Sequence, residues 1–244
     1  MNVVQDKKAL ISRLQKDILT WEGYRPPPAG TQELVGLGPV EAAFPNGVFP
    51  LGTVHELVCG NTEQASASSG LISGLLSVLM QNGRVCLWIS LRDHVFPSAL
   101  KSFGIEADQL IFIRVTRDKE ALWVMEEALK CAGLAAVVAE VKELDFKQSR
   151  RLQLAVEQSH VSGFILRNIS RKISSTACVA RWQVKALPSE PVDGLPGLGF
   201  PRWQVELLKV RNGHPGSWIM EWAEGKFRAV KEQQVLQSQK QKAG

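Results

Sequence analysis

Residues 54–76, "VHELVCGNTEQASASSGLISGLL", combine an apolar run, a glycine and a stretch of small polar residues that passes into a helical pattern. This order is typical of a strand that leads into a phosphate-binding loop at a helix N-terminus, where backbone N–H groups and the helix dipole attract an anion. The run 53–59 predicts the strand, and the pattern over 68–81 predicts the helix. The segment therefore predicts a nucleotide-binding type of fold. Whether the chain binds a nucleotide depends on the residues of the loop.

The residues that would hold the phosphate are missing from this segment. A working loop, G-x-x-x-x-G-K-[ST], has a lysine for the β- and γ-phosphates and a hydroxyl for magnesium. Counted from Gly60 with the two-residue shift that suits the predicted helix, the G-K-[ST] positions hold Ala67, Ser68 and Ser69, and the ungapped register lacks the lysine as well. Each lost charge-assisted contact is worth roughly 1.5–3 kcal/mol, so only weak phosphate affinity is expected from this degenerate loop.

The pattern up to residue 167 alternates between short apolar runs and helical stretches. Further strands are predicted over 84–90, 109–115, 134–141 and 161–167, and helices over 97–103, 118–132 and 147–159. Continuous apolar strands separated by helices predict an α/β fold with a mostly parallel sheet that is covered on both faces.

The pattern changes after residue 167. Residues 179–187 and 202–210 alternate between apolar and polar side chains, "RNGHPG" (211–216) reads as a turn, and "SWIMEWA" and "GKFRAV" follow it. These features predict an antiparallel β-hairpin extension at the edge of the parallel core.

The N-terminal residues predict a separate helical arm. Leu10, Leu14, Ile18 and Trp21 recur near helical spacing within 6–22, and the prolines that follow stop the helix. The arm is interpreted either as packing on its own domain or as a means of self-association or partner docking. The expected organisation is an arm with a Pro-rich linker over 1–30, a core domain over 31–230 and a flexible tail over 231–244.

Composition excludes several classes of function. Hydrophobic residues make up 45% and charged residues 22% of the 244, which is typical of a globular chain. The four cysteines and four histidines lack metal-ligand spacing, and the serines lack a G-x-S-x-G motif, so no metal, cofactor or catalytic residue is predicted. We find no signal peptide and no long apolar run, which predicts a cytoplasmic chain without a membrane partner.

Several collinear segments resemble one family. They are "GVFPLGTVHEL" (47–57), "ISLRDHVFPSALKSFGIEADQLIF" (89–112), "EALKCAGLAAVVAEV" (127–141) and "GLGFPRWQVELLKVRNGHPGSWIMEW" (197–222). Over roughly residues 45–230 the chain resembles RecA-fold proteins, and among them the ImuA family of accessory proteins of bacterial translesion synthesis. The resemblance implies a RecA-like core.

Carried over by position, the resemblance implies that catalysis is lost. Arg92 aligns with the catalytic glutamate of a RecA-type ATPase, and Ala139 aligns with the magnesium-binding aspartate. A guanidinium cannot act as a base toward water. Glu140 is one position away, but neighbouring strand residues point to opposite faces. The chain is therefore expected to be a pseudo-ATPase rather than an enzyme.

The C-terminal third carries an excess of basic residues. Residues 167–244 hold thirteen Lys or Arg against six Asp or Glu. By the RecA resemblance, the strand ending near residue 167 leads into a DNA-contacting loop, so DNA or partner contact is predicted at seven residues: Arg167, Arg171, Lys172, Arg181, Arg202, Lys209 and Arg211. The tryptophans of the same region are more typical of half-buried core than of base stacking.

The resemblance implies an accessory role in SOS-induced, error-prone translesion DNA synthesis. The expected partners are ImuB, which is a homologue of Y-family polymerases, RecA, the error-prone replicative-type polymerase and single-stranded DNA. Two alternatives remain open: a weak or partner-activated, DNA-dependent ATPase that uses Glu140, and a SulA-like cell-division inhibitor that binds FtsZ.

Overall fold

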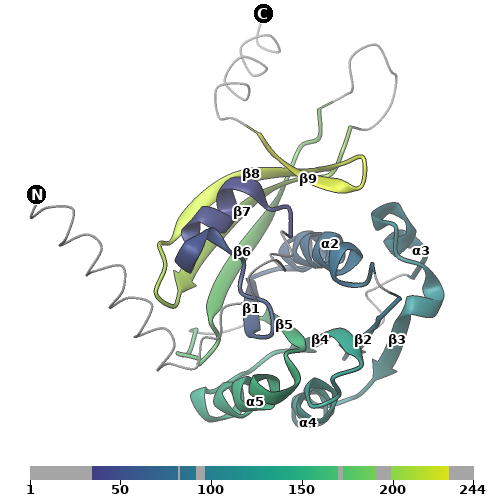
Figure 1. Ribbon diagram of the computed structural model, residues 1–244, viewed down its shortest axis with the longest axis vertical. Coiled ribbons are helices and arrows are strands. Elements are labelled where there is room, and N and C mark those ends of the chain that lie inside the picture. Colours follow the sequence, from purple (N-terminus) through teal and green to yellow (C-terminus); the bar gives the residue numbers. More distant parts are fainter. Residues whose placement is uncertain (1–34, 82, 92–96, 170–172, 191–198, 231–244) are drawn as a thin grey trace, which may run out of the picture. The chain divides into compact units, whose positions relative to one another are not determined.

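The computed structural model describes residues 35–230 except 82, 92–96, 170–172 and 191–198. The described residues form one nine-stranded mixed sheet in the order β3-β2-β4-β5-β1-β6-β7-β8-β9 (Figure 1). The predicted N-terminal arm, with Leu10, Leu14, Ile18 and Trp21, and the predicted tail over 231–244 lie outside the described residues.

The first six strands of the chain pair in parallel. They are β1 (Val54–Cys59), β2 (Val85–Ser90), β3 (Leu110–Arg114), β4 (Leu134–Val141), β5 (Ser162–Asn168) and β6 (Ala180–Leu187). All six residues of β1 are buried, because the strand lies in the middle of the sheet with both faces covered. The predicted parallel α/β core is confirmed.

The remaining strands form an antiparallel meander: β7 (Arg202–Val210), β8 (Gly216–Ala223) and β9 (Lys226–Val230). Glu224 and Gly225 both have positive φ, as a tight two-residue hairpin between β8 and β9 requires. The predicted antiparallel extension is confirmed, with one refinement. Its first strand, β6, pairs in parallel with β1 and so joins the extension to the core.

Helices cover both faces of the parallel part (Figure 1). The long helix α2 (Thr62–Leu79) lies on one face, and α4 (Asp118–Leu129) and α5 (Phe146–Ser159) lie on the other. The described residues also include the short helix α3 (Pro97–Leu100) and the 3-10 turns η1 (Gly38–Ala43), η2 (Pro45–Gly47), η3 (Lys101–Phe103) and η4 (Ala107–Gln109).

The larger hydrophobic core lies on the α2 side of the sheet and includes residues from both the parallel strands and β6–β9. Trp182, Trp203 and Trp222 are 4%, 5% and 4% exposed and belong to this core, which confirms the interpretation of these tryptophans as packing residues. Gly74 of α2 allows the sheet to approach, since a Cβ there would lie 2.5 Å from the ring of Phe227. The extension is therefore packed on the parallel core.

Candidate functional site

The connection between β1 and α2 is short. Strand β1 ends at Cys59 and helix α2 begins at Thr62, so that two residues, Gly60 and Asn61, join them. A phosphate loop is longer, because several backbone N–H groups must curve around the anion. The β1–α2 connection has no room for such a loop.

Three of the four predicted loop residues lie inside the helix. Ala67, Ser68 and Ser69 belong to α2, which starts six residues before the predicted start at 68. Ala67 and Ser68 are buried, and the Ser69 hydroxyl donates to the carbonyl of Ala65 at 2.9 Å. The predicted helix start at residue 68 is wrong, because Asn61 caps the helix so that it begins at Thr62, and these motif positions lie within the helix rather than in an anion-binding loop.

The N-terminus of α2 is capped by its own side chains. The Asn61 Oδ1 accepts from the Gln64 N–H, and the Gln64 Oε1 accepts from the Gly60 N–H, both at 2.8 Å. Glu63 adds a negative charge in the first turn, where it interacts favourably with the helix dipole. A phosphate at this position would compete with these acceptors and be repelled by Glu63.

A cavity of about 770 Å³ lies beside this helix, at the carboxyl ends of β1, β4 and β5. Cys59, Glu140 and Asn168 contribute the strand ends, and Phe103 and Trp203 are also part of the lining. Open α/β sheets bind their ligands at this edge. The cavity therefore occupies the position of a ligand site even though the phosphate loop is missing.

The end of β4 places a carboxylate at the cavity. Glu140 lines it, is 5% exposed and accepts from Trp88 Nε1 at 3.5 Å, whereas Ala139 packs in the core beneath α4 and α5. The assignment of the lost metal ligand to Ala139 is corrected, since that residue faces away from the cavity. Alternation along the strand brings Glu140 to the nucleotide side instead.

Arg92, which was predicted to occupy the position of the catalytic glutamate, lies outside the described residues, so its role stays a prediction. Among the residues that the structure describes, no group of three or more His, Cys, Asp or Glu side chains is arranged to hold a metal ion.

A buried acidic residue that sequence analysis did not single out organises the centre of the sheet. Glu56 on β1 is fully buried, and its Oε1 accepts from Arg167 Nη1 at 2.8 Å. Its Oε2 accepts from Arg181 Nε and Thr176 Oγ1, each at 2.8 Å. The signal in the sequence was a glutamate in the middle of a mostly apolar strand.

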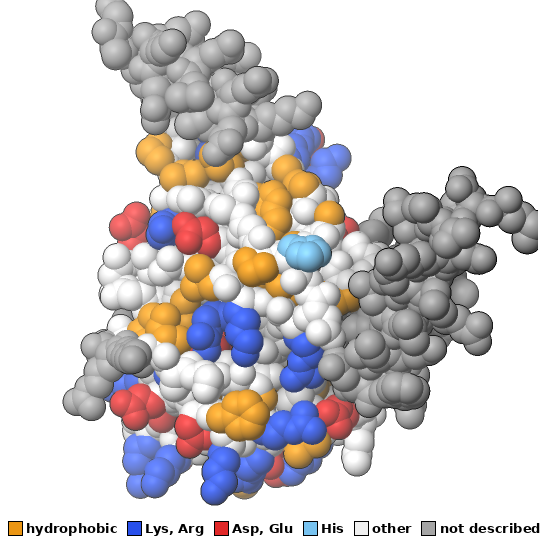
Figure 2. Space-filling view, turned by 90° about the vertical axis from the view of Figure 1, so that its left-hand side faces the viewer, with side chains coloured by type: hydrophobic (Ala, Val, Ile, Leu, Met, Phe, Trp, Pro, Cys, Tyr) orange, Lys and Arg blue, Asp and Glu red, His pale blue; other side chains and the backbone are white. Residues whose placement is uncertain are grey.

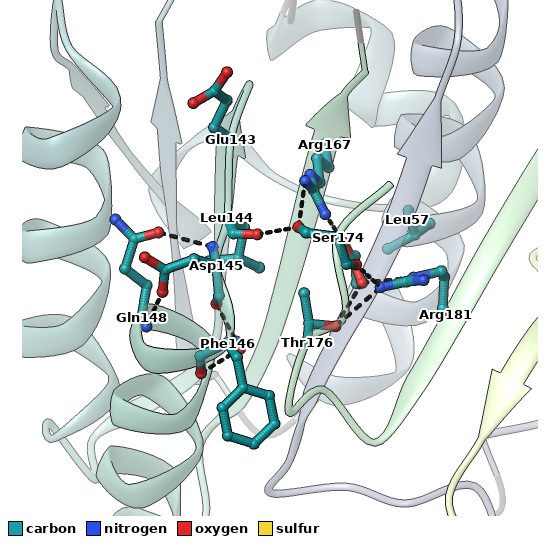
Figure 3. A network of polar contacts seen from close by, with 12 residues as sticks. Leu57, Glu143, Leu144, Asp145, Phe146, Gln148, Arg167, Ser174, Thr176 and Arg181 are labelled. Atoms are coloured by element: carbon teal, nitrogen blue, oxygen red, sulfur yellow. Dashed lines mark hydrogen bonds and ion pairs between the residues drawn. The ribbon is translucent and has the colours of Figure 1, made fainter. Parts of the chain in front are cut away.

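Arg167 and Arg181 use their remaining donors within the same network (Figure 3). Arg167 Nη2 donates to the Ser174 hydroxyl at 2.9 Å, and Arg181 Nη2 donates to the Ser174 carbonyl at 2.7 Å. The Ser174 hydroxyl in turn donates to the Leu144 carbonyl at 2.7 Å. The prediction that Arg167 and Arg181 contact DNA is therefore corrected: these cations neutralise Glu56 and fix the segment that follows β5.

Arg202 is also a structural residue. Its guanidinium is buried, lies 2.7 Å from Glu190 and 3.1 Å from Glu221, and has a raised pKa, chiefly because of Glu190. Lys209 is exposed, although its Nζ donates to the Thr176 carbonyl at 3.0 Å, and Arg211 is exposed.

The predicted basic surface is thus not assembled as the sequence suggested. Arg171 and Lys172 lie outside the described residues, and of the other five predicted contacts Lys209 and Arg211 are the exposed ones. On the face shown in Figure 2, Lys and Arg side chains lie among acidic and hydrophobic ones rather than in one continuous patch.

His55 is a core residue at the other end of β1. Its Nδ1 accepts from Trp182 Nε1 at 3.3 Å, which leaves Nε2–H to donate to the Pro50 carbonyl at 2.8 Å. Its ring stacks on Phe49 at 4.6 Å. Burial lowers the pKa of His55 to about 4, so the imidazole is neutral at physiological pH and serves packing.

Within the described part of the chain, every helix is too short or too polar to cross a bilayer.

The chain is similar to known proteins of two groups. A family model described as cell division inhibitor SulA matches residues 52–163. Protein ImuA of Caulobacter vibrioides (strain NA1000 / CB15N) is 34% identical over 194 residues, which cover 75% of this chain and 80% of that protein. Cell division inhibitor SulA of Yersinia pestis (strain Pestoides F) is 26% identical over 128 residues, covering 52% of this chain and 75% of the relative.

The fold has a solved counterpart in a crystal structure of the RadB recombinase. It superimposes with a TM-score of 0.55 at 16% identity and covers 81% of this chain and 99% of that one. This likeness confirms the RecA-like fold. Taken with the ImuA relative and the SulA model, it shows that the chain is a RecA-like protein of the ImuA family, which is related to SulA.

Proposed function

We propose that the chain acts without catalysis in SOS-induced, error-prone translesion DNA synthesis, as an accessory protein that brings ImuB, RecA and the error-prone polymerase together. Its ImuA family membership supports the pathway. The observation that carries the non-catalytic part is the two-residue connection between β1 and α2, with its self-capped helix and the carboxylate of Glu63.

Triphosphate hydrolysis requires cations around the transferred phosphate and a positioned base. At the start of α2, side-chain oxygens already accept hydrogen bonds from the backbone N–H groups that would bind the phosphate. The negative charge of Glu63 would repel the phosphate. A chain of this kind acts by binding other proteins and not by catalysis. Holding a polymerase near RecA raises its effective concentration at a stalled fork without any new catalytic group.

Direct contact with single-stranded DNA is a minor part of the proposal. Its support among the described residues is limited to Lys209 and Arg211, because Arg167, Arg181 and Arg202 pair with buried or neighbouring carboxylates. Protein partners, bound in the cytoplasm, are therefore proposed as the main ligands.

Two observations favour the alternatives. The SulA model match over 52–163 favours a division inhibitor that binds FtsZ, and Glu140 in the cavity favours a weak ATPase. The identity and coverage of the ImuA relative exceed those of the SulA relative, and Glu63 opposes the ATPase. Both alternatives rank second.

The test is deletion of the gene, followed by measurement of mutation frequency after ultraviolet damage and of filamentation. Loss of induced mutations, restored by the wild-type chain, is expected. Binding assays with purified ImuB, RecA and FtsZ then separate the candidates. Unchanged induced mutagenesis in the deletion strain, or binding to FtsZ alone, would overturn the proposal.

A further inference from the structure

The two outer strands of the described sheet, β3 and β9, differ in the side chains that they expose. Strand β9 carries the exposed cations Lys226 and Arg228, and charges along an edge strand oppose pairing with another chain. Strand β3, LIFIR, has its one charge at its last residue, Arg114, and exposes two large apolar side chains, Ile111 at 46% and Phe112 at 39%. Strand β3 is therefore the edge that favours the addition of a further strand.

The apolar side chains of β3 lie on both faces of the sheet. Leu110 belongs to the core on the α2 side, so Phe112, two residues later, lies on the same face. Ile113 packs against the core on the side of α4 and α5, and Ile111 lies on that face. A strand added at this edge would bury apolar surface on both faces, which favours an extended segment with uncharged side chains in its middle.

The backbone at Phe112 faces the outer edge of the sheet. On the inner edge, the N–H of Val115 donates to the carbonyl of Ser90 beside β2 at 3.1 Å. Successive residues of a strand direct their N–H and C=O groups to opposite edges, so Ile111 and Ile113 also face β2, whereas Phe112 faces away from it. Among the described residues, β2 is the strand that pairs with β3. Phe112 thus presents one backbone donor and one acceptor at the outer edge.

Strand β3 is complementary to itself in one antiparallel register. If two copies pair about Phe112, each Phe112 N–H meets the carbonyl of the other Phe112. Leu110 lies opposite Arg114 in this register, and Ile111 lies opposite Ile113, so the inner pairs are apolar on both faces. The two Arg114 residues fall at opposite ends of the paired strands, about 13 Å apart along them, so the register does not bring like charges together.

We propose that β3 pairs with β3 of a second copy of this chain, in the antiparallel register centred on Phe112. One sheet would then run through a symmetric dimer, and the interface would close after two copies because each contributes the same strand. A second copy is favoured as the occupant because it supplies both the matching backbone groups and the matching apolar side chains. The inference concerns the free chain and does not depend on the proposed function.

The first experiment measures the mass of the full-length chain by sedimentation equilibrium over a range of concentrations. The wild type should pass from monomer to dimer as the concentration rises. Ile111→Lys, which places a cation from each copy in the paired strands, should weaken dimerisation by about tenfold or more. Leu154→Lys on α5 is the matched control, since Leu154 is 47% exposed, and it should dimerise like the wild type. A monomer at every concentration, or an Ile111→Lys dimer as stable as that of the wild type, would overturn the proposal.

Cysteine cross-linking tests the register. The background is Cys131→Ser, because Cys131 is exposed whereas the other three cysteines are buried. Phe112→Cys would bring the two Cα atoms to about 5.5 Å, within reach of a disulfide, so the oxidant diamide should yield a covalent dimer. Thr116→Cys, exposed and beyond the end of β3, would lie more than about 20 Å from its counterpart and should stay monomeric. Failure of Phe112→Cys to cross-link, or equal cross-linking of Thr116→Cys, would contradict the pairing.

A binding assay with purified ImuB tests the other occupant of this edge, an extended segment of a partner protein. If the wild type is monomeric and Ile111→Lys loses ImuB binding that Leu154→Lys retains, the edge belongs to the partner and the proposed dimer is wrong. If the wild type dimerises through β3, the edge belongs to the second copy. Sedimentation reports self-association and the deletion strain reports the pathway, so failure of this inference and failure of the proposed function remain distinguishable.

Discussion

The carboxylate of Glu56 lies 2.8 Å from the guanidinium of Arg167 in the buried centre of the sheet. The pair joins β1 to the neighbouring β5, and Arg181 of β6 contacts the second oxygen of the same carboxylate at 2.8 Å. Three adjacent strands are therefore tied to one acidic group. The arrangement explains why Arg167 and Arg181 face inward.

Glu56→Gln should destabilise the fold strongly. The substitution removes the carboxylate that pairs with the guanidinium groups of Arg167 and Arg181 in the interior. Breaking a buried pair of this kind lowers the unfolding free energy by about 3–5 kcal/mol. Urea unfolding followed by circular dichroism measures it. The control is Glu157→Gln, whose 3.7 Å contact with Arg150 is exposed and should change stability by less than about 1 kcal/mol. Equal, small effects of both variants would contradict a structural role for Glu56.

Asn61→Ala should remove the cap of α2. The N–H of Gln64 then loses its acceptor, and the expected cost is about 1 kcal/mol of unfolding free energy. Gln158→Ala, an exposed change near the other end of a different helix, is the control and should be close to neutral. An Asn61→Ala variant as stable as the wild type would show that the helix does not begin at this cap.

Stability should fall as the pH is lowered from about 6.5 to about 4, because burial holds the pKa of His55 near 4 in the folded chain while the unfolded chain protonates near 6.5. The unfolded state binds the proton first on acidification, so the free energy of unfolding falls by up to about 3 kcal/mol across this window. Above about pH 6.5 this group makes no further change to it. Unfolding free energies at a series of pH values measure the slope. The His55→Gln variant should be less stable at pH 7 and show a flatter slope; an unchanged slope would assign the effect to other groups.

Gly74→Ala should destabilise the contact between α2 and the C-terminal strands. A Cβ at this position would lie 2.5 Å from the Phe227 ring and 3.0 Å from the Trp222 ring, both buried in the same core. Overpacking of about 1–3 kcal/mol should exceed the gain of about 1 kcal/mol in helix propensity. Gly133→Ala meets nothing within 4 Å and serves as the control in thermal unfolding. A Gly74→Ala variant with a raised melting temperature would contradict the packing described.

The sequence predicted the elements well because their signals are local. Strand 134–141 and strand 202–210 coincide with β4 and β7, since apolar runs bounded by polar turns define them. The start of α2 was missed because serines and a threonine weaken the helical pattern. In the structure the Ser66, Ser69 and Ser73 hydroxyls bond to carbonyls of their own helix, so these residues are accommodated.

The site was harder to predict because it depends on pairing between distant residues. The sequence suggested that Arg167 and Arg181 are surface cations. In the sheet, both contact Glu56, which is more than a hundred residues away in the chain. Likewise, the choice between Ala139 and Glu140 depends on which face of β4 meets α2. A motif alignment that is off by one residue cannot decide this.

The most direct measurement is a calorimetric titration of the full-length chain with ATP and magnesium, combined with an assay for phosphate release. We expect no saturable binding at millimolar nucleotide and no phosphate release above the spontaneous rate, because the capped start of α2 leaves no donors for the phosphates and Glu63 repels them. Saturable micromolar binding with magnesium-dependent hydrolysis, lost in Glu140→Gln, would contradict it.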